Sequence, residues 1–275
     1  MNFDNFWFAF GLTVFAGLST GIGSALAFFT KKTNTKLLSV SLGFSAGVMI
    51  YVSFVEILGK SRDSLSLVYG ETHGAWLTVL SFFVGVAVIA LIDKLIPSQE
   101  NPHEIKRIED IKNGGSVKDP KLVRMGLFTA LAIAIHNFPE GIATFFAGLA
   151  EPELAIPIAV AIAIHNIPEG IAVSVPISYG TGSKKRGFFL SFLSGLAEPV
   201  GALIAYFILI IFFRGTETIP YSLFGFMFGG VAGIMVFISI DELLPTAEEY
   251  GHHHYSIYGF VIGMAVMALS LLLFI

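Results

Sequence analysis

Apolar stretches long enough to cross a lipid bilayer follow one another through most of the chain, and they limit its fold more than any other feature. A helix that spans the hydrocarbon core needs roughly 20 predominantly apolar residues. Charged residues make up only 13% of the 275, about half the usual share of a soluble domain. The pattern predicts an all-α integral membrane protein with eight transmembrane helices, at about residues 6–29, 37–58, 74–96, 124–149, 154–179, 187–213, 221–244 and 256–275.

The basic residues predict how these helices are oriented. One long polar segment, within which we expect a loop over 97–123, separates the third span from the fourth. Loops on the cytoplasmic side of a membrane carry an excess of Lys and Arg. If the N-terminus is outside, 13 of the 16 Lys and Arg residues fall on the cytoplasmic side. The chain is therefore expected to form a single transmembrane transporter domain over 1–275, with both termini extracytoplasmic.

Two pairs of segments in the chain repeat each other. Residues 132–143 read AIAIHNFPEGIA and residues 161–172 read AIAIHNIPEGIA, so they differ at one of twelve positions. The segment that begins at Ala46 in the second span matches, in register, the one that begins at Ala232 in the seventh. Fainter matches pair the first span with the sixth and the third with the eighth, and shared composition explains these equally well. Because partner spans are separated by an odd number of crossings, the order predicts a 3+2+3 inverted repeat, as is typical of secondary transporters.

The repeated His-Asn-x-Pro-Glu-Gly motif places metal-ligating side chains on one face of a helix. At about 100° per residue, Glu140 lies between His136 and Asn137 around the helix. Its carboxylate could therefore bridge one metal held by the imidazole and a second held by the amide. Imidazole with carboxylate suits Zn²⁺, Fe²⁺ or Mn²⁺, and a thiolate site is excluded because the chain has no Cys. The second copy of the motif supplies the same three types of side chain: His165, Asn166 and Glu169.

Proline accompanies each candidate carboxylate. Pro139 and Pro168 cannot donate a hydrogen bond to the preceding turn, which predicts kinks beside the ligands. Glu198, which is followed rather than preceded by a proline, adds a third carboxylate. An acidic side chain at the bilayer centre costs about 2.5–3.5 kcal/mol, so three of them indicate bound cations. The alternative is that His and Glu only hydrogen-bond between packed helices, which explains one motif better than two identical copies.

With these motifs the chain resembles the Zrt/Irt-like (ZIP) metal transporters, most closely their bacterial members, over all eight spans. The resemblance rests on the paired motifs and on Gly-Leu-Ala-Glu-Pro from Gly195. It implies a binuclear centre between the fourth and fifth spans, and a sliding of spans 1, 4, 5 and 6 against spans 2, 3, 7 and 8. The implied first metal site is His136, Glu140, His165 and Glu169. The implied second site is Asn137, Glu140, Asn166, Glu169 and Glu198.

Other candidates follow from the resemblance or from position along the chain. Met49 matches a place where some ZIP transporters supply a thioether to the first site, although methionine in an apolar helix usually only packs. Glu56 and its repeat partner Glu242 lie near span ends, where they could form an entrance and an exit, or could simply be solvated. The cluster His252–His254 could receive metal on the cytoplasmic side, or could have no role.

The sequence as a whole predicts a secondary, non-ATP transporter that imports Zn²⁺, and also Fe²⁺, Mn²⁺, Co²⁺ and Cd²⁺, across a bacterial inner (plasma) membrane. The metals, up to two bound, are substrates, and no cofactor or nucleic acid is expected. A homodimer is left open, and so is a selective channel that uses the same site. A metalloprotease would place Glu directly after the first His, whereas each motif here has Asn, so we expect no enzyme.

Overall fold

The computed structural model describes residues 5–29, 35–95, 120–150, 152–181, 183–213, 220–250 and 253–272, and these ranges are helical with no strand. The α-helices are α1 (Phe6–Phe29), α2 (Thr35–Val52), α3 (Leu58–Tyr69), α4 (Glu71–Leu95), α6 (Pro120–Ala150), α7 (Pro152–Thr181), α8 (Lys184–Gly195), α9 (Ala197–Phe213), α10 (Tyr221–Ile238), α11 (Leu244–Tyr250) and α12 (His253–Leu272). Two π-helical turns, η2 (Ser53–Ile57) and η4 (Ser239–Leu243), join α2 to α3 and α10 to α11.

Several of these helices are long and apolar enough to cross a membrane. Over the described residues, seven segments meet this condition: Phe6–Leu26, Ser39–Tyr69, Glu71–Lys94, Ala155–Val175, Lys184–Ile211, Tyr221–Glu248 and His254–Leu272. Each overlaps a predicted span, so the chain is an all-helical, multi-pass membrane protein. The remaining predicted span, 124–149, lies within α6, which is a continuous helix of 31 residues but is not one of the seven.

The helix in the second predicted span continues well beyond the apolar stretch. We expected the span to end at residue 58, yet α3 continues to Tyr69, and Gly70 (φ +81°) separates it from α4. Hydropathy falls at Lys60 and Arg62, but neither residue disfavours a helix, so helix end and span end do not coincide. The predicted loop over 97–123 lies outside the described residues as far as residue 119, and its last residues belong to α6.

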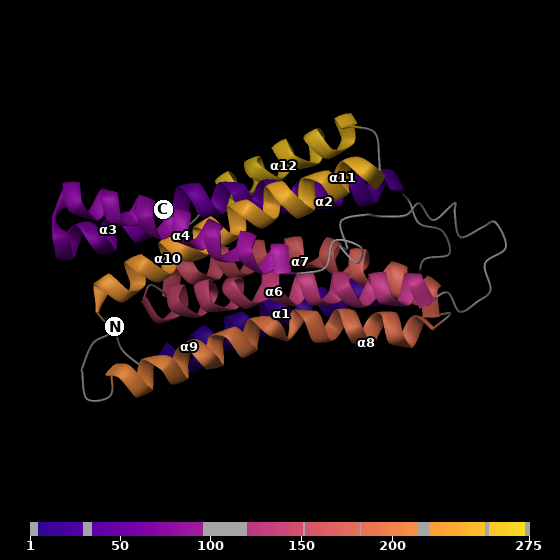
Figure 1. Cartoon of the computed structure of the whole chain (residues 1–275), viewed down its shortest axis with the longest axis horizontal. Helices are drawn as coiled ribbons and strands as arrows, with labels where there is room; N and C mark the ends of the chain where they lie inside the picture. The colour runs from indigo at the N-terminus through magenta and orange to yellow at the C-terminus, as the bar shows by residue number, and fades with distance from the viewer. Residues whose placement is uncertain are drawn as a thin grey trace.

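The helices form two groups that lie against each other (Figure 1). The first, which we call the α6 layer, consists of α1, α6, α7, α8 and α9. The second, the α2 layer, consists of α2, α3, α4, α10, α11 and α12. The most extensive pairings stay within a layer: α2 with α12, α1 with α7, α4 with α10, and α6 with α7. Helix α2 meets α7 across the boundary, and α10 meets α6.

Aromatic packing holds α6 against its neighbours on both sides. The Phe146 ring meets Phe224 of α10 edge-on, with ring centroids 4.9 Å apart. Phe145, next to it, packs in the same way against Phe6 of α1, at 5.8 Å. Because both phenylalanines follow Glu140 by less than two helical turns, this packing fixes the helix that carries the first motif.

Candidate metal site

The helix in the sixth predicted span is broken next to its carboxylate. Helix α8 ends at Gly195 and α9 begins at Ala197, so Glu198 stands in the first turn of α9. In contrast, α6 and α7 continue as helices through Pro139 and Pro168. The proline after Glu198 thus accompanies a helix interruption, whereas those of the two motifs lie inside unbroken helices.

The last glycine of each motif allows a neighbouring helix to approach the site closely. A Cβ atom on Gly141 would collide with the backbone carbonyl of Glu198, and one on Gly170 would collide with that of Thr20. Only glycine permits backbones to approach this closely in a membrane bundle. These two contacts set α9 against α6 and α1 against α7, and the first brings Glu198 to the helix of the first motif.

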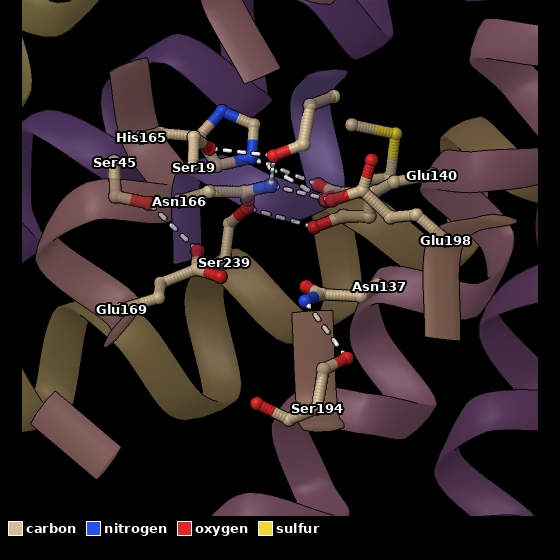
Figure 2. A network of polar contacts seen from close by, with 12 residues as sticks. Ser19, Ser45, Asn137, Glu140, His165, Asn166, Glu169, Ser194, Glu198 and Ser239 are labelled. Atoms are coloured by element: carbon tan, nitrogen blue, oxygen red, sulfur yellow. Dashed lines mark hydrogen bonds and ion pairs between the residues drawn. The ribbon is translucent and has the colours of Figure 1, made fainter. Parts of the chain in front are cut away.

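Of the seven His, Asn and Glu ligands predicted for the two sites, six have described side chains, and all six are 0% exposed. They come from α6, α7 and α9 and converge on one region between these helices (Figure 2). Buried ionisable side chains in a membrane protein mark functional sites, because lipid does not solvate charge. The six are Asn137, Glu140, His165, Asn166, Glu169 and Glu198.

His165 and Glu140 bring the two motifs into direct contact. The His165 Nε2 atom lies 3.2 Å from Oε1 of Glu140 and 3.4 Å from Oε2. A tetrahedral zinc ion with ligands at its usual bond lengths would hold two such atoms about 3.4 Å apart. The pair therefore has a spacing that a shared metal ion could bridge, and imidazole with carboxylate is a ligand set for such an ion.

A second group of contacts surrounds Glu198. The Asn166 side-chain amide donates to the carboxylate of Glu198 and to the Ala16 carbonyl, at 3.0 Å. The Asn137 amide donates to the Ser194 carbonyl at 3.3 Å. These bonds orient both side chains through nitrogen and leave their amide oxygens for another partner.

The side-chain oxygens of the two asparagines lack a described partner. Oδ1 of Asn137 and Oδ1 of Asn166 are buried, and neither has a hydrogen-bond partner among the described residues. Buried polar atoms are almost always partnered, so each such oxygen needs an explanation. Amide and carboxylate oxygens bind hard divalent cations, and both oxygens belong to residues of the predicted second site.

The Glu169 side chain accepts a hydrogen bond from a residue of the α2 layer. The Ser45 hydroxyl of α2 donates to Oε1 of Glu169 at 2.9 Å, as Figure 2 shows. Ser45 could not be identified from the sequence, because a single serine in an apolar helix produces no distinctive pattern. The residue lies one helical turn before the candidate Met49, on the same helix face. Met49 is fully buried, and its role as a ligand stays a prediction.

His136 lies in the helical backbone of α6, but its side chain is outside the described part of the chain. Among the side chains that are described, no three His, Asp or Glu residues are grouped closely enough to hold a metal ion. The structure thus brings His165 to Glu140 and Asn166 to Glu198, and the four-ligand set stays a prediction.

The other candidates lie apart from this buried cluster. Glu56 and Glu242 are both partly buried and both lie in the π-helical turns. His254 is exposed and stacks on Tyr258. His252 and the His253 side chain lie outside the described residues.

A small, partly open hollow of about 60 Å³ adjoins Glu56. Its polar lining includes Glu56, Lys60 and Ser64. On α6 it is lined by alanines that follow Glu140 along one helix face, because they recur every three or four residues. These are Ala143, Ala147 and Ala150. The hollow therefore lies along the same face of α6 as Glu140, and Glu140 is located deeper in the bundle.

Comparison with known proteins points to one family. Residues 94–271 match the family model described as ZIP zinc transporter. A zinc transporter ZupT of Chlorobium chlorochromatii is 62% identical over 271 residues, which cover 98% of this chain and 99% of the relative. A protein of the same name from Clostridium perfringens is 57% identical and covers 100% and 98%. A third, from Streptococcus mutans, is 62% identical and covers 97% of both chains.

Proposed function

Because this chain belongs to the ZIP zinc transporter family, whose members are transporters rather than enzymes, we propose that it imports Zn²⁺ into the cytoplasm as a secondary transporter. The observation that carries the proposal is the fully buried contact of His165 with Glu140 between α6 and α7. An imidazole and a carboxylate held at this spacing inside a membrane bundle are suited to a divalent transition metal. Other metals with the same ligand preference, Fe²⁺, Mn²⁺, Co²⁺ and Cd²⁺, are proposed as further substrates.

The proposed centre binds up to two ions that share carboxylates. His136 and His165 would contribute imidazoles to the first ion, together with Glu140 and Glu169. The second ion would take the two glutamates in common with the first, and its other ligands would be Asn137, Asn166 and Glu198. This division is supported by the Asn166–Glu198 contact and by the two asparagine oxygens without a described partner.

The proposed 3+2+3 inverted repeat is supported by contacts that occur in related pairs. The π-helical turns η2 and η4 begin seven residues after Ala46 and Ala232, where the two matching segments start. The motif glycines contact backbone carbonyls at Glu198 and Thr20, which are partners in the match of the first and sixth spans. A two-fold axis in the membrane plane accounts for both pairs and would place the site near the midplane.

The proposal extends to the location of the protein. Eight spans with both termini outside the cytoplasm follow from counting α6 as a span and from the distribution of Lys and Arg. The relatives named above come from bacteria, which supports the inner membrane as the site of action. A homodimer is compatible with this arrangement.

The proposal is tested by zinc uptake into liposomes that contain the purified protein and no ATP. We expect wild-type uptake to saturate with external Zn²⁺, and Glu140→Gln to lose about 100-fold or more of the rate. We expect a loss of this size because replacing a metal ligand removes an interaction worth several kcal/mol. Glu153→Gln is the matched control, since Glu153 is exposed in α7 and its loss should leave uptake unchanged. Absence of uptake by the wild-type protein, or wild-type rates in Glu140→Gln, would contradict the proposal.

A further inference from the structure

A buried hydrogen bond joins the α2 layer to the candidate metal site. Ser45 of α2 donates to Glu169 of α7, and both side chains are 0% exposed. The six described His, Asn and Glu ligands all belong to α6, α7 and α9, that is, to the α6 layer, whereas the candidate Met49 belongs to α2. Ser45 therefore connects the α2 layer directly to a candidate ligand of the α6 layer.

The bond differs in its acceptor from those that Ser239 and Ser39 make. Serine in an apolar helix commonly donates to a carbonyl of the preceding turn, as Ser239 does to Met235 at 2.7 Å. Ser39, also on α2, donates to the Ala247 carbonyl at 2.6 Å. Ser45 donates instead to an ionisable side chain, and such charge-assisted bonds are about twice as strong as neutral ones.

The fold itself does not require this hydroxyl. In the repeat, position 45 corresponds to Val231, which is buried in α10 and cannot donate. The same helix position thus accepts a purely apolar side chain in the other half of the chain. Because the first half of the repeat has a hydroxyl at this position and the second half does not, we assign Ser45 a role at the candidate metal site rather than in helix packing.

We infer that Ser45 is a positioning residue that orients the Glu169 carboxylate for metal binding. Fixing Oε1 through the hydroxyl restricts rotation of the carboxylate, so that it is held in one orientation before the metal arrives. Ligating carboxylates are commonly hydrogen-bonded in this way, and loss of the supporting partner lowers metal affinity. The inference rests on the proposed function, because it assigns Ser45 a role at that same site.

The inference is tested by the zinc affinity of the purified full-length protein, measured by calorimetry. We expect Ser45→Ala to weaken zinc binding by about tenfold or more. Ser39→Ala, which removes a buried serine hydroxyl from the same helix, should bind zinc as the wild type does. Equal affinities in Ser45→Ala and the wild type would overturn the inference.

A double-mutant cycle separates positioning from a general effect on packing. In a Glu169→Gln background, Ser45→Ala should cause no further loss of affinity, because the carboxylate that the hydroxyl orients is absent. Additive losses would overturn the inference. If Ser45→Ala does not fold, the pair Ser45→Thr and Ser45→Val, which have the same shape, isolates the hydroxyl. Affinity retained in Ser45→Thr and lost in Ser45→Val supports the inference, and equal affinity contradicts it.

The outcomes distinguish this inference from the proposed function. Zinc uptake by the wild-type protein that is abolished by Glu140→Gln supports the site, whatever Ser45 does. Normal zinc affinity in Ser45→Ala would then refute the positioning role alone. A wild-type protein that neither binds nor transports zinc would refute the proposed function, and the inference with it.

Discussion

The side-chain amide of Asn166 donates to the carboxylate of Glu198, so that α7 and α9 are joined inside the candidate site. Both side chains are 0% exposed, and Glu198 stands where the helix is interrupted between α8 and α9. The repeat partner of Glu198 is Thr20, which has no charge. The pair therefore makes the site asymmetric, and this asymmetry has a measurable consequence.

Removal of the Glu198 charge should eliminate one metal ion and spare the other. We expect Glu198→Gln to bind about one zinc ion per chain where the wild type binds about two, because the proposed first site does not include Glu198. Stoichiometry is measured by elemental analysis of protein dialysed against buffered Zn²⁺. Two ions bound by Glu198→Gln would contradict a second site that depends on this carboxylate.

The His165–Glu140 contact predicts that the first site depends on both motifs. Glu140→Ala or His136→Ala should abolish zinc uptake, because either change removes a ligand and leaves the others buried without their cation. Uptake by whole cells is measured together with the amount of protein in the membrane. Wild-type uptake in either variant would overturn the ligand assignment.

The close approach of α6 to α9 at Gly141 predicts a strong packing effect. A larger side chain there would collide with the Glu198 carbonyl, so Gly141→Val should destabilise the protein by about 1–3 kcal/mol, as overpacking does. The melting temperature in detergent measures this loss. Gly59→Ala is the control, since a Cβ at Gly59 meets nothing within 4 Å. In α3 this substitution should be neutral or stabilising by up to about 1 kcal/mol. Equal melting temperatures for Gly141→Val and the wild type would contradict the close contact.

The helices and many of the buried polar residues could be predicted from the sequence, because both depend on local signals. Long apolar runs locate the helices, and the repeated motif identifies His165 and Glu140, which the structure brings into contact. Ser45 could not be predicted, since its importance comes from α7 lying across from it. The continuation of α3 past the apolar stretch was also missed, because hydropathy reports on lipid contact and not on where a helix ends.

Lys60 could not be identified from the sequence either, because only packing shows that it lines the same hollow as Glu56. A positive charge there would repel cations if they approach Glu140 through this hollow. We therefore expect Lys60→Gln to lower the KM for zinc about fourfold at low ionic strength, the effect of one charge on a divalent ion at roughly 10 Å in water. The difference should vanish near 0.5 M salt, where such interactions are screened over a few ångströms.

Arg62→Gln is the matched control for Lys60→Gln. Arg62 lies in the same helix but is exposed and contacts Glu71 at 3.8 Å, and it is not among the residues that line the hollow. Its removal should change the KM much less than removal of Lys60 does. If both variants shift the KM equally, the effect comes from net surface charge, and the hollow is not the route by which zinc reaches Glu140. A shift in Lys60→Gln alone that disappears with salt would assign the hollow to zinc entry.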